Sequence, residues 1–245
     1  MEVYEPRPRE LALEYLEAYI LEHHVSTHDA LPPERELCQK WQISRSTLRS
    51  AISHMIASGK LYAIQGSGTY VSPRVRRNLQ DLESFTSFAH RQGMKASSRL
   101  LSFSCITADE GLAREFGDEA GLLLYQIVRL RCINDLPLLI ESSYIPKSLA
   151  PHLEAHDIVS ASLYDILKKN YGLKPSHGWE KVSATSASAE EAHYLEIPEN
   201  STVFWLISKT SSPDGALFEY CRTVGRSDRL EFCSTLRWRK RNEPS

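Results

Sequence analysis

The chain has 245 residues, which at roughly 150 residues per domain corresponds to one large domain or two modest ones. Hydrophobic residues make up 42% and charged residues 24%, as in ordinary globular proteins, which argues against a disordered or fibrous chain. No apolar stretch is long enough to span a membrane, and the N-terminal residues lack the features of a secretory signal. The five cysteines are widely spaced and never form a CxxC pair, which favours reduced thiols in a cytoplasmic protein and no metal site.

The net charge of −2 conceals an uneven distribution along the chain. Residues 35–77 contain eight basic side chains and one acidic side chain, a charge of +7, whereas residues 78–245 contain 19 basic and 22 acidic side chains, a charge of −3. A local basic segment on a near-neutral chain is typical of a nucleic-acid-binding domain joined to a second domain. A solvated basic face is the alternative, and charge alone does not separate the two interpretations.

The first sixty residues carry the pattern of three helices. Apolar residues recur at helical spacing and predict a first helix over residues 9–24, followed by a short second helix that ends at Trp41. Ser44 is a good N-cap, because its hydroxyl can accept a hydrogen bond from a free backbone amide of the first turn. The third helix is expected over residues 45–58, with Gly59 just past its C-terminal end.

The third helix has the two faces that a DNA recognition helix needs. Its apolar stripe is Leu48, Ala51, Ile52 and Met55, and its opposite face presents Arg45, Ser46, Thr47, Arg49, Ser50 and Ser53. Small hydroxylated residues let such a helix enter the major groove, where guanidinium groups can reach guanine edges or phosphates. Two short strands, 61–64 and 69–71, flank the glycine-rich tip 65–68, which completes a winged helix-turn-helix.

Three motifs in this region resemble the winged-helix domain of GntR-type bacterial transcription regulators. They are Leu31-Pro32-Pro33-Glu34-Arg35-Glu36-Leu37, Ser44-Arg45-Ser46-Thr47-Leu48-Arg49-Ser50-Ala51-Ile52 and Gln65-Gly66-Ser67-Gly68-Thr69-Tyr70-Val71. The resemblance implies DNA contacts by Arg35, Ser44, Arg45, Thr47, Arg49, Gly66, Ser67 and Gly68. Pro33 departs from the family pattern, which usually has a capping serine at that place. An ion pair with a neighbouring acid is the alternative role for each of the three arginines.

Beyond a linker over residues 73–84, the pattern alternates between strands and helices. Strands are expected over 99–103, 122–132, 138–145, 181–186, 202–211, 217–224 and 230–238, and helices over 109–116, 162–170 and 189–195. Consecutive strands joined by tight turns predict an antiparallel sheet with helices packed on it, an α+β domain. The sequence shows no enzyme signature, and it predicts no cofactor.

Four charged residues fall on strands that are expected to be half-buried. Arg129 and Arg131 are two residues apart, so their side chains leave the same face of one strand, while Glu141 and Glu219 lie on later strands. Two guanidinium groups on one face can hold a phosphate or a carboxylate, and the carboxylates can take hydroxyl or amino groups. The alternative is an internal network of arginine and glutamate that only holds the sheet together.

The second half of the chain also resembles a known module, the effector-binding UTRA domain of the HutC branch of GntR regulators. The matching residues are Arg129, Arg131, Pro137, Glu141-Ser142-Ser143-Tyr144-Ile145-Pro146, Ser162-Leu163-Tyr164-Asp165-Ile166-Leu167 and Asp228-Arg229. The resemblance implies the fold of chorismate lyase and an effector site lined by Thr86, Arg129, Arg131, Glu141, Ser162, Tyr164 and Glu219. Gly225 stands where the family often has an aromatic residue, which leaves that wall of the site open to a different ligand.

The sequence therefore predicts a winged helix-turn-helix domain over residues 1–72 and an effector-binding and dimerisation domain over residues 85–241. The expected function is that of a ligand-responsive transcription regulator, a repressor that a small metabolite such as a phosphosugar, an amino sugar or a carboxylate releases from a palindromic operator. A homodimer is expected, because one short helix reads only a few base pairs. Two alternatives stay open: a second domain that binds a protein partner, and a lyase-type enzyme with an accessory DNA-binding domain.

Overall fold

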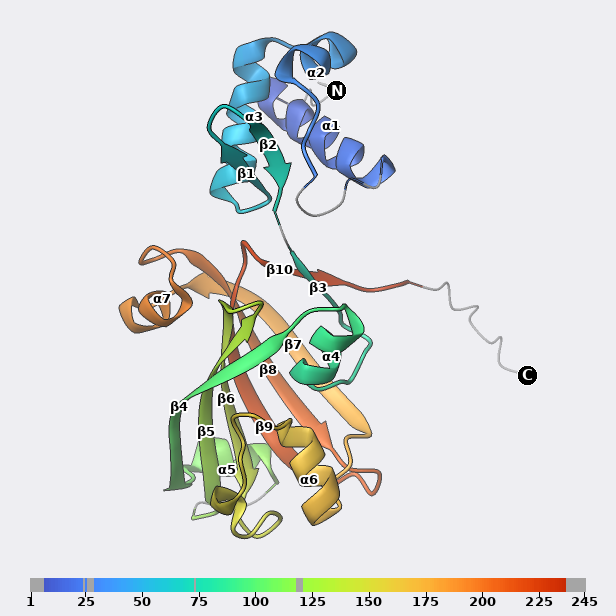
Figure 1. Cartoon of the computed structure of the whole chain (residues 1–245). Coiled ribbons are helices and arrows are strands. Elements are labelled where there is room, and N and C mark those ends of the chain that lie inside the picture. Colours follow the sequence, from blue (N-terminus) through green and yellow to red (C-terminus); the bar gives the residue numbers. More distant parts are fainter. Residues whose placement is uncertain (1–6, 24, 26–28, 73, 118–120, 237–245) are drawn as a thin grey trace, which may run out of the picture. The chain divides into compact units, whose positions relative to one another are not determined.

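The computed structural model of the chain describes residues 7–23, 25, 29–72, 74–117 and 121–236. The chain divides into two compact units (Figure 1), one comprising Met1–Val75 with Ser227–Glu231 and the other Arg76–Arg226 with Phe232–Ser245. No described helix is long and apolar enough to cross a membrane. Each unit has its own hydrophobic core, and each is described below by itself.

The first unit is a winged helix-turn-helix. It contains α1 (Pro8–Glu22), α2 (Glu34–Trp41), α3 (Arg45–Ala57) and the antiparallel hairpin of β1 (Leu61–Ile64) and β2 (Gly68–Val71). Its core is made of Ala12, Leu16, Leu31, Leu37, Leu48, Ala51, Ile52, Met55 and Leu61. The apolar stripe predicted for the third helix is buried there, which confirms that the opposite face of α3 points away from the core.

The second unit is built on one six-stranded antiparallel sheet in the order β4-β5-β6-β9-β8-β7 (Figure 1). The strands are β4 (Ala96–Thr107), β5 (Leu123–Ile133), β6 (Leu136–Pro146), β7 (His177–Ser186), β8 (Thr202–Ser211) and β9 (Leu217–Arg226). Two sets of three consecutive strands meet where β6 pairs with β9, from Leu139 opposite Gly225 to Tyr144 opposite Tyr220. We call this pairing the central seam, since it joins residues about 80 positions apart in the sequence.

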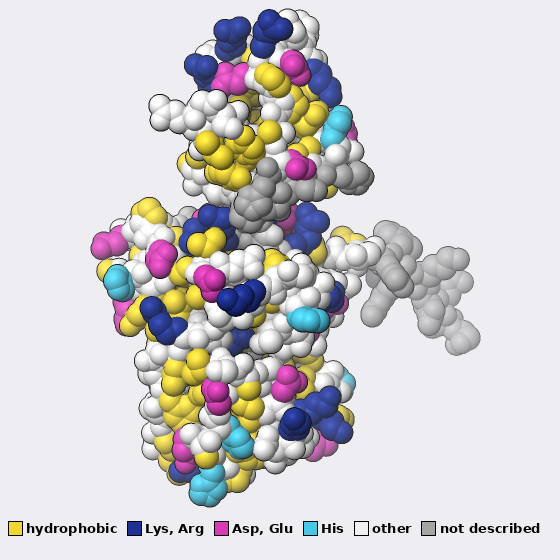
Figure 2. Space-filling view, in the orientation of Figure 1, with side chains coloured by type: hydrophobic (Ala, Val, Ile, Leu, Met, Phe, Trp, Pro, Cys, Tyr) yellow, Lys and Arg dark blue, Asp and Glu magenta, His cyan; other side chains and the backbone are white. Residues whose placement is uncertain are grey.

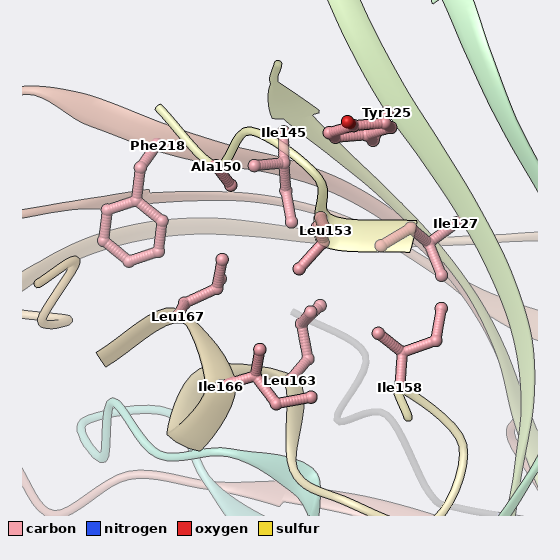
Figure 3. Packing of buried hydrophobic residues seen from close by; sticks show 10 residues of the cluster. All are labelled: Tyr125, Ile127, Ile145, Ala150, Leu153, Ile158, Leu163, Ile166, Leu167 and Phe218. Carbon is pink, nitrogen blue, oxygen red and sulfur yellow. The ribbon is translucent and has the colours of Figure 1, made fainter. Parts of the chain in front are cut away.

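Helices cover both faces of the sheet. On one face, α6 (Leu163–Tyr171) points Leu163, Ile166 and Leu167 at a cluster that includes Ile127 and Ile145 (Figure 3). On the other face, α5 (Glu110–Glu115) and α7 (Ala189–Leu195) pack on separate clusters of alternate strand residues. The short helix α4 (Phe85–Arg91) and the 3₁₀ turn η1 (Leu153–Ala155) complete the unit. The α+β class and the antiparallel sheet that the sequence predicts are thus confirmed.

Several expected boundaries were wrong. The predicted closing strand 230–238 is only β10 (Leu230–Cys233), which pairs with β3 (Val75–Asn78) in a separate two-stranded sheet. Its predicted last two residues, Arg237 and Trp238, lie outside the described residues, as does Pro73 of the predicted linker.

Other elements differ in length from the prediction. The first helix ends at Glu22, while its predicted last residue, His24, lies outside the described part of the chain. The strand predicted over 99–103 extends to Ala96–Thr107, because this strand carries four serines and lacks the apolar alternation by which strands are recognised. The strand predicted over 181–186 begins earlier, at His177, and α4 was not predicted.

Candidate DNA-binding surface and effector site

Capping and packing fix the orientation of the recognition helix α3. The Ser44 hydroxyl accepts a hydrogen bond from the backbone amide of Thr47 at 3.1 Å, so the helix begins at Arg45 as predicted. The Ser44 hydroxyl also lies 2.8 Å from the Thr47 hydroxyl. With Leu48 buried in the core, the side chains of Arg45 and Arg49 remain exposed.

The exposed arginines of this unit differ in their partners. The Arg49 Nε donates to a carboxylate oxygen of Glu34 on α2 at 2.8 Å, which is the alternative that the sequence left open for an arginine here. Arg35 and Arg45 are exposed, and neither forms an ion pair with a residue that the structure describes. Several Lys and Arg side chains gather at the end of the unit where α2 lies (Figure 2). This end has the positive charge that a phosphate backbone attracts.

The tip of the wing is exposed and free of bulky side chains. Gly66 and Gly68 have backbone φ angles of +78° and +149°, a region that favours glycine, and a Cβ on Gly66 would meet nothing within 4 Å. Behind the tip, the rings of Tyr62 and Tyr70 stack with centroids 5.4 Å apart and stiffen the hairpin. Ser67 completes the tip, and its hydroxyl hydrogen-bonds that of Tyr70. Such a tip can approach a nucleic-acid backbone closely.

In the second unit, two buried arginines share one carboxylate. Arg129 and Arg131 on β5 are each 3% exposed, and Glu141 on β6 lies directly opposite Arg129. The Arg129 Nη2 donates to Glu141 Oε2 at 2.5 Å, and its Nη1 donates to the carbonyl of Ile158 at 3.4 Å. The Arg131 Nη1 lies 3.8 Å from the same Glu141 oxygen. One carboxylate therefore serves two guanidinium groups.

The hydrogen-bonding capacity of these arginines is not exhausted. The Nε atoms of both Arg129 and Arg131 are buried without a hydrogen-bond partner among the described residues. The Arg131 guanidinium lies over the ring of Phe85, 4.5 Å from its centroid, and its Nη2 is 3.5 Å from the hydroxyl of Thr86. Since a buried polar group without a partner is costly, this arrangement favours a further acceptor at Arg131.

A second polar group lies on the same face of the sheet. The Tyr164 hydroxyl of α6 donates to a carboxylate oxygen of Glu219 on β9 at 2.6 Å and lies 2.9 Å from the hydroxyl of Thr210 on β8. Glu219 is 4% exposed and stands opposite Thr210. Ser162 is buried, and its hydroxyl accepts from the backbone amide of Asp165 at 3.4 Å, so this residue caps α6.

The pKa values of the two buried carboxylates are shifted in opposite directions. Burial raises the pKa of Glu219, against the hydrogen bond from Tyr164. Burial would also raise the pKa of Glu141, but Arg129 and Arg131 outweigh that effect and lower it. Burial brings the pKa of Arg131 down to about 10, in spite of Glu141. The site thus combines two guanidinium groups, a carboxylate whose ionised form they stabilise, and a second carboxylate whose ionised form burial disfavours.

Three small polar residues lie between the arginine pair and Glu219. Cys221 stands opposite Ser143, and Thr223 stands opposite Glu141, and all three side chains are buried. They were missed in the sequence, as were Thr210 and Phe85. The signal was present in β9, where Glu219, Cys221 and Thr223 recur at every second position and so share one face of the strand. Neutral small residues are common in strands, however, and this spacing alone did not identify them.

The structure therefore places Thr86, Arg129, Arg131 and Glu141 in one contact network and Tyr164 and Glu219 in another on the same sheet face. Ser162 caps α6 and forms no hydrogen bond with the described residues of either network. Gly225 lies opposite Leu139 in the central seam.

Comparison with known proteins assigns both units. The model for bacterial regulatory proteins of the gntR family matches residues 8–71, and the UTRA domain model matches residues 91–231. The chain belongs to the GntR family. It is of the HutC type, in which the winged helix is followed by a UTRA domain, and it is a ligand-responsive DNA-binding transcription regulator.

Several relatives resemble this GntR regulator over most of its length. The HTH-type transcriptional repressor NagR of Bacillus subtilis is 35% identical over 222 residues, which cover 90% of each chain. The mannosyl-D-glycerate transport/metabolism system repressor MngR of Escherichia coli is 26% identical, with 83% of this chain and 85% of MngR covered. The crystal structure of PhnF from Mycobacterium smegmatis matches with a TM-score of 0.67 and 26% identity, covering 92% of this chain and 99% of that one.

Proposed function

We propose that this GntR regulator is a cytoplasmic homodimer that represses transcription at a palindromic operator and leaves it when a small anionic metabolite binds the UTRA domain. The DNA contacts are assigned to Arg35, Ser44, Arg45, Thr47, Arg49, Gly66, Ser67 and Gly68. A two-fold dimer presents two recognition helices to two half-sites, which doubles the contacts of one short helix. The metabolite shifts the population away from the DNA-binding state through its higher affinity for the other state.

The buried Arg131 carries the proposal of an anionic ligand. Its Nε has no hydrogen-bond partner among the residues that the structure describes, while its guanidinium group shares Glu141 with Arg129 and lies beside the hydroxyl of Thr86. A phosphate or carboxylate group would supply the acceptor. Glu219 and Tyr164 would then take the hydroxyl or amino groups of the same ligand. The relative MngR, which is named for mannosyl-D-glycerate, supports a sugar-derived compound.

A melting-temperature screen tests this assignment. The protein is heated with phosphosugars, amino sugars and small carboxylates, and a ligand that binds the folded state raises the melting temperature. We expect at least one hit that is lost in Arg131→Ala, while operator binding by that variant stays unchanged. Arg131→Lys is the control for retained charge. If no compound raises the melting temperature, a protein partner becomes the better candidate for the second domain.

A hit is then followed on operator DNA. The compound should release the wild-type protein from the operator and leave Arg131→Ala bound. If Arg131→Ala fails to fold, that result supports the alternative, an internal network of arginine and glutamate that only holds the sheet together.

A further inference from the structure

The second unit begins with a segment that closes on itself. Its first residue, Arg76, directly follows the N-terminal part of the first unit. Just past the end of α4, the Gln92 side chain donates to the backbone carbonyl of Arg76 at 2.8 Å. Within the loop that this bond closes, Arg91 of α4 forms an ion pair of 2.9 Å with Asp81. We call residues 76–92 the bridging segment, and we expect these internal bonds to make it move as one body.

The bridging segment contacts the candidate effector site at the start of α4. Its residues Phe85 and Thr86 both lie against the Arg131 guanidinium, which is 4.5 Å from the ring centroid and has its Nη2 3.5 Å from the hydroxyl. The Nε of the same guanidinium has no hydrogen-bond partner among the described residues. An anion that binds Arg131 therefore acts on the bridging segment as well as on the sheet.

The beginning of the bridging segment is anchored at an edge of the same sheet. The Arg77 Nη2 forms an ion pair of 2.9 Å with Glu180 Oε1 on β7, and the Glu180 side chain is only 16% exposed. Glu180 stands opposite Ser208, which in turn stands opposite Cys221, so the Glu180 side chain leaves the face that carries the effector site. A carboxylate that is buried to this extent needs a cation, and Arg77 supplies it.

A third contact lies between these two. Leu82 packs on β7 where Gly178 leaves room for it, since a Cβ on Gly178 would be 2.9 Å from the Leu82 side chain. Gly178 stands opposite Thr210, whose hydroxyl is 2.9 Å from that of Tyr164. The bridging segment thus touches the sheet beside both polar networks of the site.

Arg77 also contributes to the charge of the effector site. Burial would raise the pKa of Glu141, and the arginine pair lowers it, with a further contribution in the same direction from Arg77. An anion bound at the arginine pair would therefore attract Arg77 as well, because charges in a partly buried site interact beyond direct contact. The anion and Glu180 thus compete for one guanidinium group.

We propose that the Arg77–Glu180 ion pair holds the chain between the two units in its DNA-binding arrangement and that a bound anion weakens this pair. The anion acts in two ways, because it attracts Arg77 and displaces the bridging segment through Phe85 and Thr86. Arg77 is the second residue of the second unit, so a change in its position reaches the connection between the units directly. Arg77 and Glu180 are positioning residues, which need touch neither the operator nor the effector. The inference rests on the proposed function and names the contact by which the effector regulates it.

Loss of the Glu180 carboxylate tests the pair without any ligand. We expect Glu180→Ala to raise the operator dissociation constant about five-fold, the largest factor that an exposed ion pair usually contributes. The sign is diagnostic, because removal of an acid would by itself strengthen binding to a polyanion. Glu115→Ala, which removes an acid from the ion pair with Lys209 elsewhere in the unit, is the matched control and should not weaken operator binding. Fluorescence anisotropy at fixed salt measures both variants.

A charge swap tests whether the pairing itself is what matters. Arg77→Glu combined with Glu180→Arg restores an ion pair at unchanged net charge, and operator affinity should return to the wild-type value. Glu180→Gln keeps the size of the side chain and should behave like Glu180→Ala, and it decides the question if Glu180→Ala is unfolded. The inference is overturned if both Glu180 variants bind the operator as tightly as wild type, if Glu115→Ala weakens binding equally, or if the swap binds no better than Glu180→Ala.

The response to ligand separates this inference from the proposed function. The probe is the compound that raises the melting temperature most in the screen. It should weaken operator binding by a factor about five-fold smaller in Glu180→Ala than in wild type, because the variant has already lost the ion pair that the compound weakens. Its affinity for the free protein should not fall. If no compound releases the wild type from the operator, the proposed function and this inference are both contradicted. If a compound releases wild type and Glu180→Ala by the same factor, only the role of the ion pair is contradicted.

Discussion

Glu141 and Glu219 lie on the same sheet face, yet their surroundings give them different ionisation. Two arginines stabilise the anionic form of Glu141 and lower its pKa. Glu219 receives a hydrogen bond from Tyr164, but burial raises its pKa. Sequence periodicity predicted that Arg129 and Arg131 share a face, because a strand has a period of two. Periodicity could not predict which carboxylate the two arginines would bind. The register of β5 with β6 and of β6 with β9 determines which carboxylate lies nearest to them.

The raised pKa of Glu219 predicts a pH dependence of stability. The folded state favours the protonated acid, so wild-type stability falls as the pH rises from the ordinary value of 4.5 through the raised pKa. Glu219→Gln removes this loss, and its free energy of unfolding relative to wild type should increase over that interval. Glu141→Gln should show the opposite trend at lower pH. Ionised Glu141 stabilises the wild type at neutral pH, and this stabilisation is lost as the pH falls through the lowered pKa of Glu141. The free energy of unfolding of Glu141→Gln relative to wild type should therefore decrease as the pH rises through that interval. Urea titrations at a series of pH values measure both, and parallel wild-type and Glu219→Gln curves would refute the assignment.

The ion pair between Arg49 and Glu34 predicts that an acid can limit DNA affinity. Glu34→Ala frees Arg49 for a phosphate, and we expect operator affinity to increase up to about five-fold, since an exposed ion pair contributes up to about 1 kcal/mol. Glu36→Ala, which removes an exposed acid from the same helix, is the matched control for a general charge effect. Fluorescence anisotropy at fixed salt measures the difference. Equal increases in operator affinity in both variants would mean that the ion pair with Glu34 does not limit DNA binding by Arg49.

At the scale of the element, serine caps begin several helices, and one of them lies in the candidate site. Ser162 caps α6 and Ser188 caps α7 in the same way. Replacing either by alanine should lower the free energy of unfolding by about 1 kcal/mol. Only Ser162→Ala should also weaken effector binding, because α6 carries Tyr164. Calorimetric titration with a hit from the screen distinguishes the two variants, and equal ligand affinities would assign Ser162 to capping alone.

Elements with strong local signals were predictable, and elements fixed by distant pairing were not. The stripe of Leu48, Ala51, Ile52 and Met55 identified α3, and Ser44 fixed its first residue. By contrast, β10 is defined by its pairing with β3, more than 150 residues earlier in the chain, and no local pattern encodes that partner. The first half of β7 was missed because His177-Gly178 carries no apolar alternation.

At the scale of the whole molecule, the effect of the effector on operator binding and the effect of the operator on effector binding must be equal in size. If the effector weakens operator binding by a given factor, the operator must weaken effector binding by the same factor, because both describe one coupling free energy. We expect a factor between about 5 and 150, the usual range for such coupling. Titration of the effector into free protein and into the protein–operator complex measures it. Equal effector affinities would show that the ligand does not regulate DNA binding.

The position of the central seam affects when the candidate effector site forms during folding. Arg129, Arg131 and Glu141 come from the strands before the seam, whereas Thr210 and Glu219 come from those after it. Each set of strands forms through contacts between residues that are near in sequence, whereas the pairing of β6 with β9 must close a long loop. Because closing a long loop is slow, we expect this pairing to form late in folding. The two halves of the site thus meet only in a nearly complete fold. If the proposed metabolite binds residues of both halves, it should stabilise the pairing of β6 with β9, and we expect it to slow unfolding and to leave the folding rate unchanged.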